Sequence, residues 1–373
     1  MFMNELKDLA GIGIPYGGCV RNALNSETIL DFHLIVESKS LRYLGRFLGK
    51  RPEPMEAGLL KSIWGGKPVY IRTVKKLNEK NVRMVLEKQP FTVNMAALMN
   101  GEIFSIHSAL DDIRNRVLKV HGDPDRLFKK EPILILKAIR LIGMGYRPEE
   151  RLSKSIKRNV HMLSSAKPEF IGEEVFKAAC RKFSGFIEGL VKYKAYRYVF
   201  PEIGDMLETR HSPESRHKGK TVYEHSLEVL KRLEAKGASP TIKIAGFFHD
   251  VGKPYVKEVV DGEVRFPRHA GYGARIMSKR LSELGIRRGI VRDVFRLILL
   301  HQTFHAIIFR PEPDPRKIFM SMVKKFKAGR LIDDLVMLCA ADADIGEETY
   351  RNLAEEIKRE LNMSRWRKHR ILA

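Results

Sequence analysis

The sequence predicts an α+β protein, with a small α/β head at the N-terminus followed by a longer helical part. Two observations lead to this class. Before about residue 120, apolar runs typical of strands alternate with glycine-rich turns, at 31–36, 68–74 and 102–106. From about residue 123 onward, apolar residues recur at intervals of three and four, which is the period of a helix with one buried face, as in 132–144, 151–163 and 170–192.

The chain length of 373 residues accommodates two or three domains. A polar stretch at 205–220 interrupts the helical pattern and is the expected boundary between helical domains. Beyond it the helical pattern continues, except for a hairpin predicted over 256–267 with its turn at Asp261-Gly262. The expected parts are a head, a basic helical neck and body, a second helical domain and a basic C-terminal tail, at 1–122, 123–205, 206–350 and 351–373.

Cysteine usage and hydropathy indicate a protein of a reducing compartment. The three cysteines, Cys19, Cys180 and Cys339, are too far apart for a zinc-thiolate spacing and too few for a disulfide framework. The N-terminal residues lack the pattern of a secretory leader, and no run approaches the ~18 apolar residues of a membrane span. We therefore expect a cytoplasmic protein with no membrane partner.

The strong positive charge predicts a polyanionic partner. The formal net charge is +23 at pH 7, and residues 151–200 carry 11 Lys and Arg against 4 Asp and Glu. Because cations that replace condensed counterions on a phosphate backbone gain free energy by releasing them, RNA is the expected partner. The predicted RNA-binding side chains are Lys154, Lys157, Arg158, Arg181, Lys182, Lys192, Lys194 and Arg197.

Histidines gather in the C-terminal half. Seven of the twelve lie between residues 211 and 305, namely His211, His217, His225, His249, His269, His301 and His305. His249 and Asp250 close an apolar helical run and precede Val251-Gly252-Lys253-Pro254, where glycine and proline end the helix. An imidazole and a carboxylate at a helix end are suitable ligands for a divalent metal ion. Lys253, about one turn further on, is placed to meet a phosphate.

Three further helical segments supply candidate ligands. His225 lies on an amphipathic helix and Asp342 near the end of another, so that a helical bundle can bring them to His249-Asp250. His269 and His301 can complete a second metal position. The predicted metal ligands are therefore His225, His249, Asp250, His269, His301 and Asp342, with Asp344 as a weaker substitute for Asp342.

The order His225, His249-Asp250 and Asp342 resembles that of the HD-type phosphohydrolases. The resemblance implies hydrolysis of phosphate esters at one or two divalent ions, with manganese, iron, cobalt or nickel suited to mixed histidine and carboxylate ligands. A bound ion supplies hydroxide at neutral pH by lowering the pKa of water. Catalytic roles are expected for Asp250, Lys253 and His249, and Arg275 is a further candidate for stabilising charge in the transition state.

The head resembles the class II tRNA nucleotidyltransferases and poly(A) polymerases, whose first motif reads GGxVRD followed by DxD. The matching positions are Gly17-Gly18-Cys19-Val20-Arg21-Asn22, Asp31 with His33, Phe91-Thr92-Val93-Asn94, and the runs 110–117, 122–124 and 132–140. The resemblance covers nearly the whole chain, and many members of that family carry an HD domain after the helical neck and body. It implies tRNA as the partner.

The sequence differs from this family at the positions that carry out its chemistry. The family's two strand carboxylates hold magnesium, whereas here the second is His33, an imidazole that magnesium disfavours. Asn22 replaces an aspartate, Lys88-Gln89-Pro90 replaces an Arg-Arg-Asp run, and Leu134 replaces the arginine that reads the incoming base. We therefore expect a degenerate nucleotidyltransferase site, comprising Gly17, Gly18, Arg21, Asp31 and His33, in a head that folds without polymerising.

These observations predict a metal-dependent phosphohydrolase that acts on RNA ends such as 2′,3′-cyclic, 2′- or 3′-phosphates, with tRNA as the expected RNA and the head as its holder. One alternative is a CCA-, CC- or A-adding tRNA nucleotidyltransferase with altered motifs. A second is a non-catalytic RNA-binding protein. Which terminal phosphate is removed, and whether the chain forms a homo-oligomer, are left open by the sequence.

Overall fold

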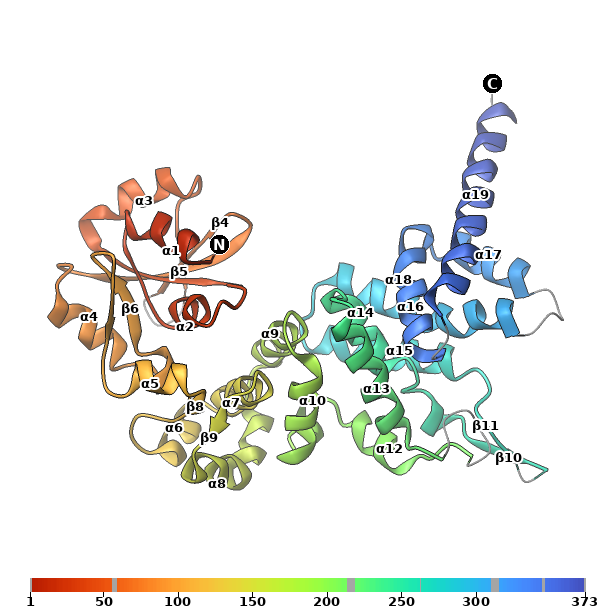
Figure 1. The fold of residues 1–373 in the computed structure, drawn as a ribbon, viewed down its shortest axis with the longest axis horizontal. Coiled ribbons are helices and arrows are strands. Elements are labelled where there is room, and N and C mark those ends of the chain that lie inside the picture. Colours follow the sequence, from red (N-terminus) through yellow and green to blue (C-terminus); the bar gives the residue numbers. More distant parts are fainter. Residues whose placement is uncertain are drawn as a thin grey trace. The chain divides into compact units, whose positions relative to one another are not determined.

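The computed structural model describes residues 2–55, 59–212, 219–261, 263–309, 315–343 and 346–371. The chain divides into two compact units, Met1–Met162 and Leu163–Ala373 (Figure 1). The first unit contains the larger sheet and the second is mainly helical, so the expected α+β class with an N-terminal α/β region is confirmed. In the described part of the chain, no helix is both long enough and apolar enough to cross a membrane.

A five-stranded sheet forms the centre of the head, with strand order β1-β2-β5-β4-β3. The strands β2 and β5 run parallel, with Phe32 opposite Val69, and the other neighbours pair antiparallel. The predicted strands at 31–36 and 68–74 are β2 and β5. The strand bounds are β1 Ile14–Pro15, β2 Phe32–Glu37, β3 Glu53–Pro54, β4 Leu59–Trp64 and β5 Lys67–Val74.

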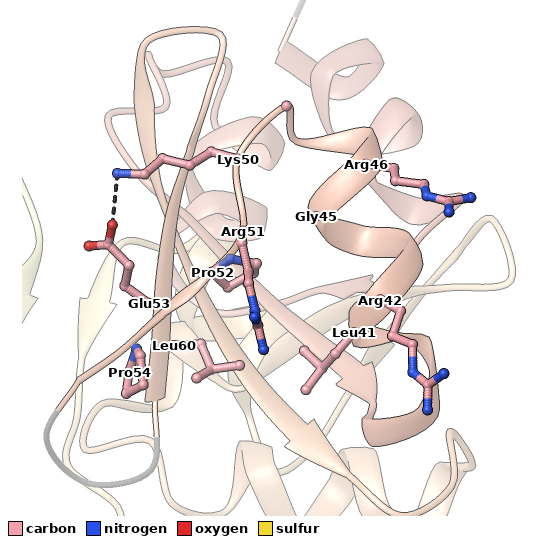
Figure 2. Close-up of a pocket in the computed structure, with 11 residues that line it drawn as sticks. Leu41, Arg42, Gly45, Arg46, Lys50, Arg51, Pro52, Glu53, Pro54 and Leu60 are labelled. Atoms are coloured by element: carbon pink, nitrogen blue, oxygen red, sulfur yellow. Dashed lines mark ion pairs between the residues drawn. The ribbon is translucent and has the colours of Figure 1, made fainter.

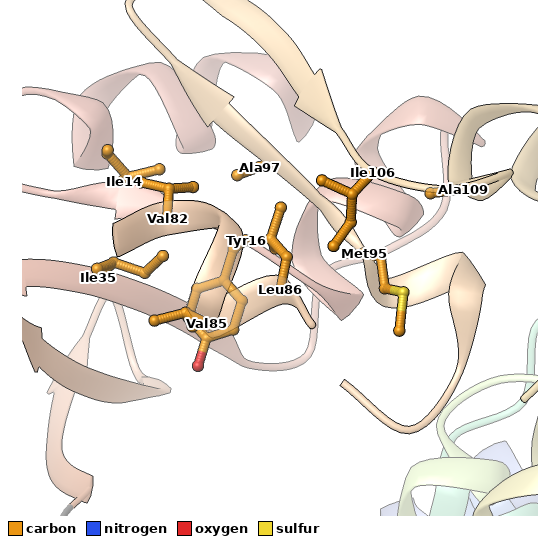
Figure 3. Close-up of a cluster of buried hydrophobic side chains, with 10 residues drawn as sticks. All are labelled: Ile14, Tyr16, Ile35, Val82, Val85, Leu86, Met95, Ala97, Ile106 and Ala109. Carbon is orange, nitrogen blue, oxygen red and sulfur yellow. The ribbon is translucent and has the colours of Figure 1, made fainter. Parts of the chain in front are cut away.

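An apolar cluster packs against this sheet (Figure 3). It joins side chains of β1 and β2 to the helix α4 (Glu79–Leu86) and to the strand β6 (Ala96–Met99), and its members are Ile14, Tyr16, Ile35, Val82, Val85, Leu86, Met95, Ala97, Ile106 and Ala109. Beside it, Gly17 begins the helix α2 (Gly18–Leu24) with a φ of 75°. A side chain disfavours this backbone region, which accounts for a glycine at the turn.

The remaining elements of the first unit complete the head and the helices that follow it. Their bounds are α1 Phe2–Ala10, α3 Leu41–Phe47, β7 Glu102–Ser105, α5 Ala109–Arg114, β8 Val117–Leu118, α6 Pro124–Lys130, α7 Ile133–Gly143, β9 Arg147–Pro148 and α8 Glu150–Asn159. The predicted strand at 102–106 is β7, which pairs with β6. The helical segments predicted at 132–144 and 151–163 correspond to α7 and to α8 with the 3-10 helix Val160–Ser165.

The second unit is helical apart from one hairpin. Its helices are α9 Pro168–Ala179, α10 Phe183–Lys192, α11 Tyr196–Val199, α12 Glu202–Glu208, α13 Val222–Ala235, α14 Pro240–Phe248, α15 His269–Glu283, α16 Arg288–Phe309, α17 Pro315–Lys325, α18 Ile332–Ala343 and α19 Glu347–Ile371. The hairpin predicted over 256–267 is formed by β10 (Glu258–Val260) and β11 (Glu263–Arg265), which pair antiparallel. Asp261 of its turn has a φ of 53°, and Gly262 lies outside the described residues.

Local sequence signals fix the two helices that carry the first ligands. Thr221 and Glu224 form a reciprocal capping box that begins α13, so that His225 lies in its first turn. Ser239 caps α14, and Pro240 occupies its first position. The helices α13 and α14 pack closely at Gly246, where a Cβ atom would lie 2.1 Å from Leu233 Cδ1. The ring of His225 in the first turn of α13 also lies close to the ring of His249 at the end of α14, with centroids 5.3 Å apart.

Candidate metal centre

Two carboxylates and four imidazoles converge in the buried core of the second unit. All six predicted ligands, His225, His249, Asp250, His269, His301 and Asp342, lie there, and each is at most 7% exposed. His225 Nε2 lies 2.8 Å from Asp342 Oδ1, and His269 Nε2 lies 3.2 Å from Asp250 Oδ1. The structure therefore brings together side chains from five segments of the chain that the sequence separates by up to 117 positions.

Backbone carbonyl groups orient three of the imidazoles. The Nδ1 atoms of His249, His269 and His301 lie 2.8, 2.9 and 2.6 Å from the carbonyl oxygens three residues earlier. A carbonyl oxygen can only accept a hydrogen bond, so each Nδ1 carries the proton and each Nε2 directs a lone pair into the cluster. Imidazoles that bind metal ions are held by this kind of support.

The surroundings of His249 give the clearest indication that a cation binds in this cluster. Its Nε2 atom is fully buried and has no hydrogen-bond partner among the described residues. It lies 3.2 Å from Asp250 Oδ2 and 3.4 Å from Asp342 Oδ1. A lone pair facing two carboxylate oxygens is repulsive unless a proton or a metal ion lies between them. The residues present fit a divalent metal ion, which satisfies all three groups.

The pKa shifts of His249, Asp250 and Asp342 also indicate that the cluster favours a bound positive charge. Burial lowers the pKa of His249, but Asp250 and Asp342 outweigh burial and raise it to about 10. Burial raises the pKa of Asp250, but His249 and Lys253 outweigh it, so that this pKa falls well below its ordinary value. The pKa of Asp342 falls likewise, through His249 and the hydrogen bond from His225, against the opposing effect of burial. Both carboxylates are therefore ionised.

Two overlapping groups have the spacing of metal ligands. One contains His225, His249 and Asp342, and the other contains His249, Asp250 and His301, with the ligand atoms of each within 4.8 Å of one another. His249 is common to both. Nitrogen and oxygen donors in this mixture suit divalent transition metals. The two groups accommodate either a single ion or a pair.

Two glycines bring His269 to the cluster. Gly252 follows Asp250 closely in the chain, and a Cβ atom there would lie 2.1 Å from the carbonyl oxygen of His269. On the facing helix α15, a Cβ atom at Gly273 would lie 2.9 Å from the backbone nitrogen of Gly252. The loop after Asp250 therefore approaches the first turn of α15 more closely than any side chain permits. This contact holds His269 within reach of Asp250.

Lys253 extends the centre toward a second histidine. Its Nζ atom donates to Asp250 Oδ2 at 2.6 Å and to His211 Nε2 at 3.0 Å. His211 Nδ1 donates to the carbonyl oxygen of Lys220 at 2.9 Å, so Nε2 is the acceptor. Burial and the charge of Lys253 lower the pKa of His211 to about 4, which keeps the ring neutral. The ammonium group has three hydrogens, and its two hydrogen bonds to described residues leave one for a substrate.

His211 and His305 are the members of the site to which the sequence assigned no role. His305 Nε2 donates to Asp342 Oδ2 at 2.7 Å, and its Nδ1 lies 2.6 Å from the hydroxyl of Tyr350. It follows His301 by one helical turn on α16, which was the available signal for its position. His305 thus orients a carboxylate ligand through its second oxygen.

Other predicted positions lie apart from the cluster. Arg275 is exposed on α15. His217 and Asp344 lie outside the described residues. Of the predicted RNA-binding residues, Lys154, Lys157 and Arg158 belong to the first unit and the others to the second; Arg181 is half-buried and the rest are exposed.

In the head, several residues at the family's motif positions make contacts with the surrounding scaffold. The buried guanidinium group of Arg21 donates to the side-chain oxygens of Asn22 and Asn94, at 2.8 and 2.5 Å. His33 stacks on Tyr70, with ring centroids 5.1 Å apart. Leu134, which stands where the family has a base-reading arginine, is 3% exposed. A buried aliphatic side chain has no hydrogen-bond donor with which to read a base.

A surface pocket of the head lies away from these motif residues (Figure 2). It has a cavity volume of about 830 Å³ and lies between α3 and the strands β3 and β4. Leucine, proline and basic side chains line it, including Leu41, Leu60 and Arg51, and Lys50 pairs with Glu53 at 2.8 Å. None of Gly17, Gly18, Arg21, Asp31 and His33 belongs to its lining.

The family model of the HD domain matches residues 222–345. This range contains all six predicted metal ligands, from His225 on α13 to Asp342 on α18. Residues 222–345 form an HD domain. Two curated relatives are CCA-adding enzymes. That of Lactobacillus helveticus is 26% identical over 113 residues, and that of Lactobacillus delbrueckii subsp. bulgaricus is 25% identical over 183 residues. These matches cover 30% and 45% of this chain but 27% and 46% of the relatives, less than half of each.

Solved structures give the same fold over most of the chain. A Thermotoga maritima CCA-adding enzyme complexed with tRNA matches 95% of this chain and 82% of its own, with a TM-score of 0.53 and 17% identity. A Bacillus stearothermophilus CCA-adding enzyme in complex with CTP matches 97% and 81%, with a TM-score of 0.55 and 15% identity. The chain therefore shares the fold of these CCA-adding enzymes over most of its length and carries an HD domain at 222–345.

Proposed function

We propose that the HD domain is a metal-dependent phosphohydrolase and that its substrates are RNA ends, in particular tRNA ends that carry a 2′,3′-cyclic, 2′- or 3′-phosphate. The observation that carries the proposal is the buried Nε2 atom of His249, which faces Asp250 and Asp342 without a hydrogen-bond partner in the described structure. Four imidazole nitrogens directed at two ionised carboxylates form a set of donors for divalent cations.

In this proposal, six residues bind the metal and Lys253 contacts the phosphate. His225, His249, Asp250, His269, His301 and Asp342 would hold one or two divalent ions, for which manganese, iron, cobalt and nickel are the candidates. Such an ion acidifies water and neutralises phosphoryl oxygens. Lys253, held by Asp250 and His211, directs its remaining hydrogen at a phosphoryl oxygen and stabilises the charge that develops there.

RNA as the substrate rests on charge and on the relatives. The net charge of +23 and the exposed lysines and arginines of α8, α10 and the segments beside them favour a phosphate backbone. The solved structures of similar fold include one named as complexed with tRNA. Basic residues of this kind position an RNA without specifying its sequence.

A panel of tRNAs and short RNAs with defined terminal phosphates, incubated with different divalent metals, tests the proposal. We expect release of phosphate, or opening of the cyclic phosphate, in the presence of at least one metal. We expect His249→Ala and Asp250→Ala to abolish turnover while RNA binding is retained. If no end is turned over with any metal, or if both variants keep the full rate, the proposal is wrong.

Nucleotide addition to tRNA is the second candidate, and the names of the relatives fit it better than they fit hydrolysis. Against it stand the single carboxylate Asp31 beside His33 and the buried Leu134. Incubating a tRNA that lacks its 3′ terminus with magnesium and labelled CTP or ATP distinguishes the two. Efficient incorporation would establish the head as a polymerising site.

A further inference from the structure

Two tyrosines form an exposed aromatic stack next to the metal centre. The rings of Tyr255 and Tyr272 are nearly parallel, with centroids 5.6 Å apart and an angle of 26° between their planes. Tyr255 is 41% exposed and Tyr272 is 44% exposed. Most aromatic pairs of this unit belong to its core, whereas this pair presents ring surface to solvent. An exposed aromatic stack is a surface onto which a further flat ring can add.

The positions of both tyrosines are tied to metal ligands. Tyr255 ends the 3-10 helix Lys253–Tyr255 and follows Lys253, whose Nζ contacts Asp250, by two residues. Tyr272 follows His269 by three residues on α15, and residues three apart on a helix are neighbours on its surface. The close contact between Gly252 and α15 fixes these two segments against each other. The Cα atoms of His269 and Tyr272 therefore lie about one helical turn, ~5 Å, apart along α15.

The stack is held in place by a contact of its own. The hydroxyl group of Tyr255 donates to Asp205 Oδ2 on α12 at 2.5 Å. Burial and this carboxylate raise the pKa of Tyr255, so the phenol stays protonated and remains a donor. With one edge of its ring fixed, Tyr255 holds the plane of the stack. A flat surface fixed before binding loses little conformational entropy when a ligand adds to it.

We propose that Tyr255 and Tyr272 form a nucleobase subsite of the metal centre. The inference rests on the proposed function and names its substrate class: a phosphate ester that carries a nucleoside, with the phosphate at Lys253 and the metal ligands and the base stacked on the tyrosines. Every nucleobase has a π face, so such a subsite accepts RNA ends of different sequence. It also discriminates against small phosphate esters that lack a base.

Binding measured without turnover tests the subsite. Calorimetry with the manganese-loaded full chain would compare adenosine 3′-phosphorothioate, a slowly hydrolysed phosphate analogue, with 1-O-methylribose 3-phosphorothioate, which lacks only the base. Stacking of one base on aromatic side chains is worth about 5- to 150-fold in affinity. We expect the adenosine compound to bind more tightly by a factor in this range.

Substitutions then assign the preference to the stack. We expect Tyr272→Ala to reduce the preference for the adenosine compound to less than about threefold, and Tyr272→Phe to retain it, because phenylalanine keeps the ring. Tyr255→Phe removes the contact with Asp205 and keeps the ring, so a partial loss is expected. Tyr43→Ala is the matched control, because Tyr43 is 70% exposed on α3 of the head, and it should change nothing.

Three results overturn the inference: equal affinity of the unsubstituted protein for the two compounds, binding of neither, or a preference that survives in Tyr272→Ala. The outcome is separable from that of the proposed function. A base preference that depends on Tyr272, in a protein that turns over no RNA end, would contradict hydrolysis and leave the nucleobase subsite standing.

Discussion

Replacing His305 by leucine should weaken metal binding, although His305 contacts a proposed ligand and not the ion itself. His305 is 8% exposed and does not belong to either group with metal-ligand spacing. Its Nε2 donates to Asp342 Oδ2 at 2.7 Å, while the other oxygen of Asp342 lies 2.8 Å from His225 Nε2. Leucine fills a similar volume, so the substitution mainly removes the donor from Oδ2.

The magnitude follows from the hydrogen bond that is lost. A hydrogen bond to a charged group contributes about 1.5–3 kcal/mol, and leaving the acceptor buried keeps its desolvation cost. Since each 1.4 kcal/mol is a factor of ten, metal affinity should fall about 10- to 100-fold, which is also the usual loss on removing the partner of a metal ligand. Competition with a fluorescent chelator at fixed pH measures this change directly.

A matched variant controls for general disturbance of the surroundings of His305. Tyr350→Phe removes the hydroxyl that lies 2.6 Å from His305 Nδ1 but keeps the bond between His305 and Asp342. We expect it to lose less than about tenfold in affinity. If His305→Leu binds metal as tightly as the unsubstituted protein, the assignment of Asp342 as a metal ligand oriented by His305 is wrong.

Four further outcomes follow from the same site. Metal must displace the proton that His249 holds with a pKa of about 10, so apparent metal affinity should rise with pH by up to about tenfold per unit towards pH 10. In the metal-free protein that protonated ring stabilises the fold below pH ~6.5, and chemical denaturation should show this stability being lost as the pH rises towards 10. Lys253→Met should lower kcat for RNA ends about 100-fold without changing the metal content, and His211→Ala should lower kcat less. If Lys253→Met and the unsubstituted protein have equal rates in steady-state assays, the role of Lys253 is wrong. Gly252→Ala should lower the free energy of unfolding by ~1–3 kcal/mol, because its methyl group would meet the carbonyl oxygen of His269; an unchanged melting temperature in calorimetry would contradict the close contact.

The sequence allowed the ligands to be predicted because each follows a local pattern. His249 and Asp250 stand where glycine and proline end a helix, and the spacing of apolar residues around His225 predicts an amphipathic helix. The strands β2 and β5 were predicted because their apolar runs are continuous and lie beside turns. Patterns of this kind depend on the nearest few residues.

The features that could not be predicted from the sequence depend on contacts between distant segments. The roles of His211 and His305 require the positions of Lys253 and Asp342, at separations of 42 and 37 residues. A histidine on a helix reads the same in sequence whether it faces solvent, core or a carboxylate. The stack of Tyr255 and Tyr272 likewise depends on the close contact at Gly252, which no periodicity signals.

We propose that hydrolysis at the HD domain, and not nucleotide addition by the head, is the activity of this chain. Two parallel reactions test this: the protein with manganese and a tRNA whose incomplete 3′ end carries a 2′,3′-cyclic phosphate, and the protein with magnesium, labelled CTP and ATP and the same tRNA with a free 3′ hydroxyl. We predict that the terminal phosphate is opened or released, that no label is incorporated, and that His249→Ala abolishes the first change. Incorporation of label into the tRNA with the free 3′ hydroxyl, together with an intact cyclic phosphate in the other reaction, would contradict this assignment.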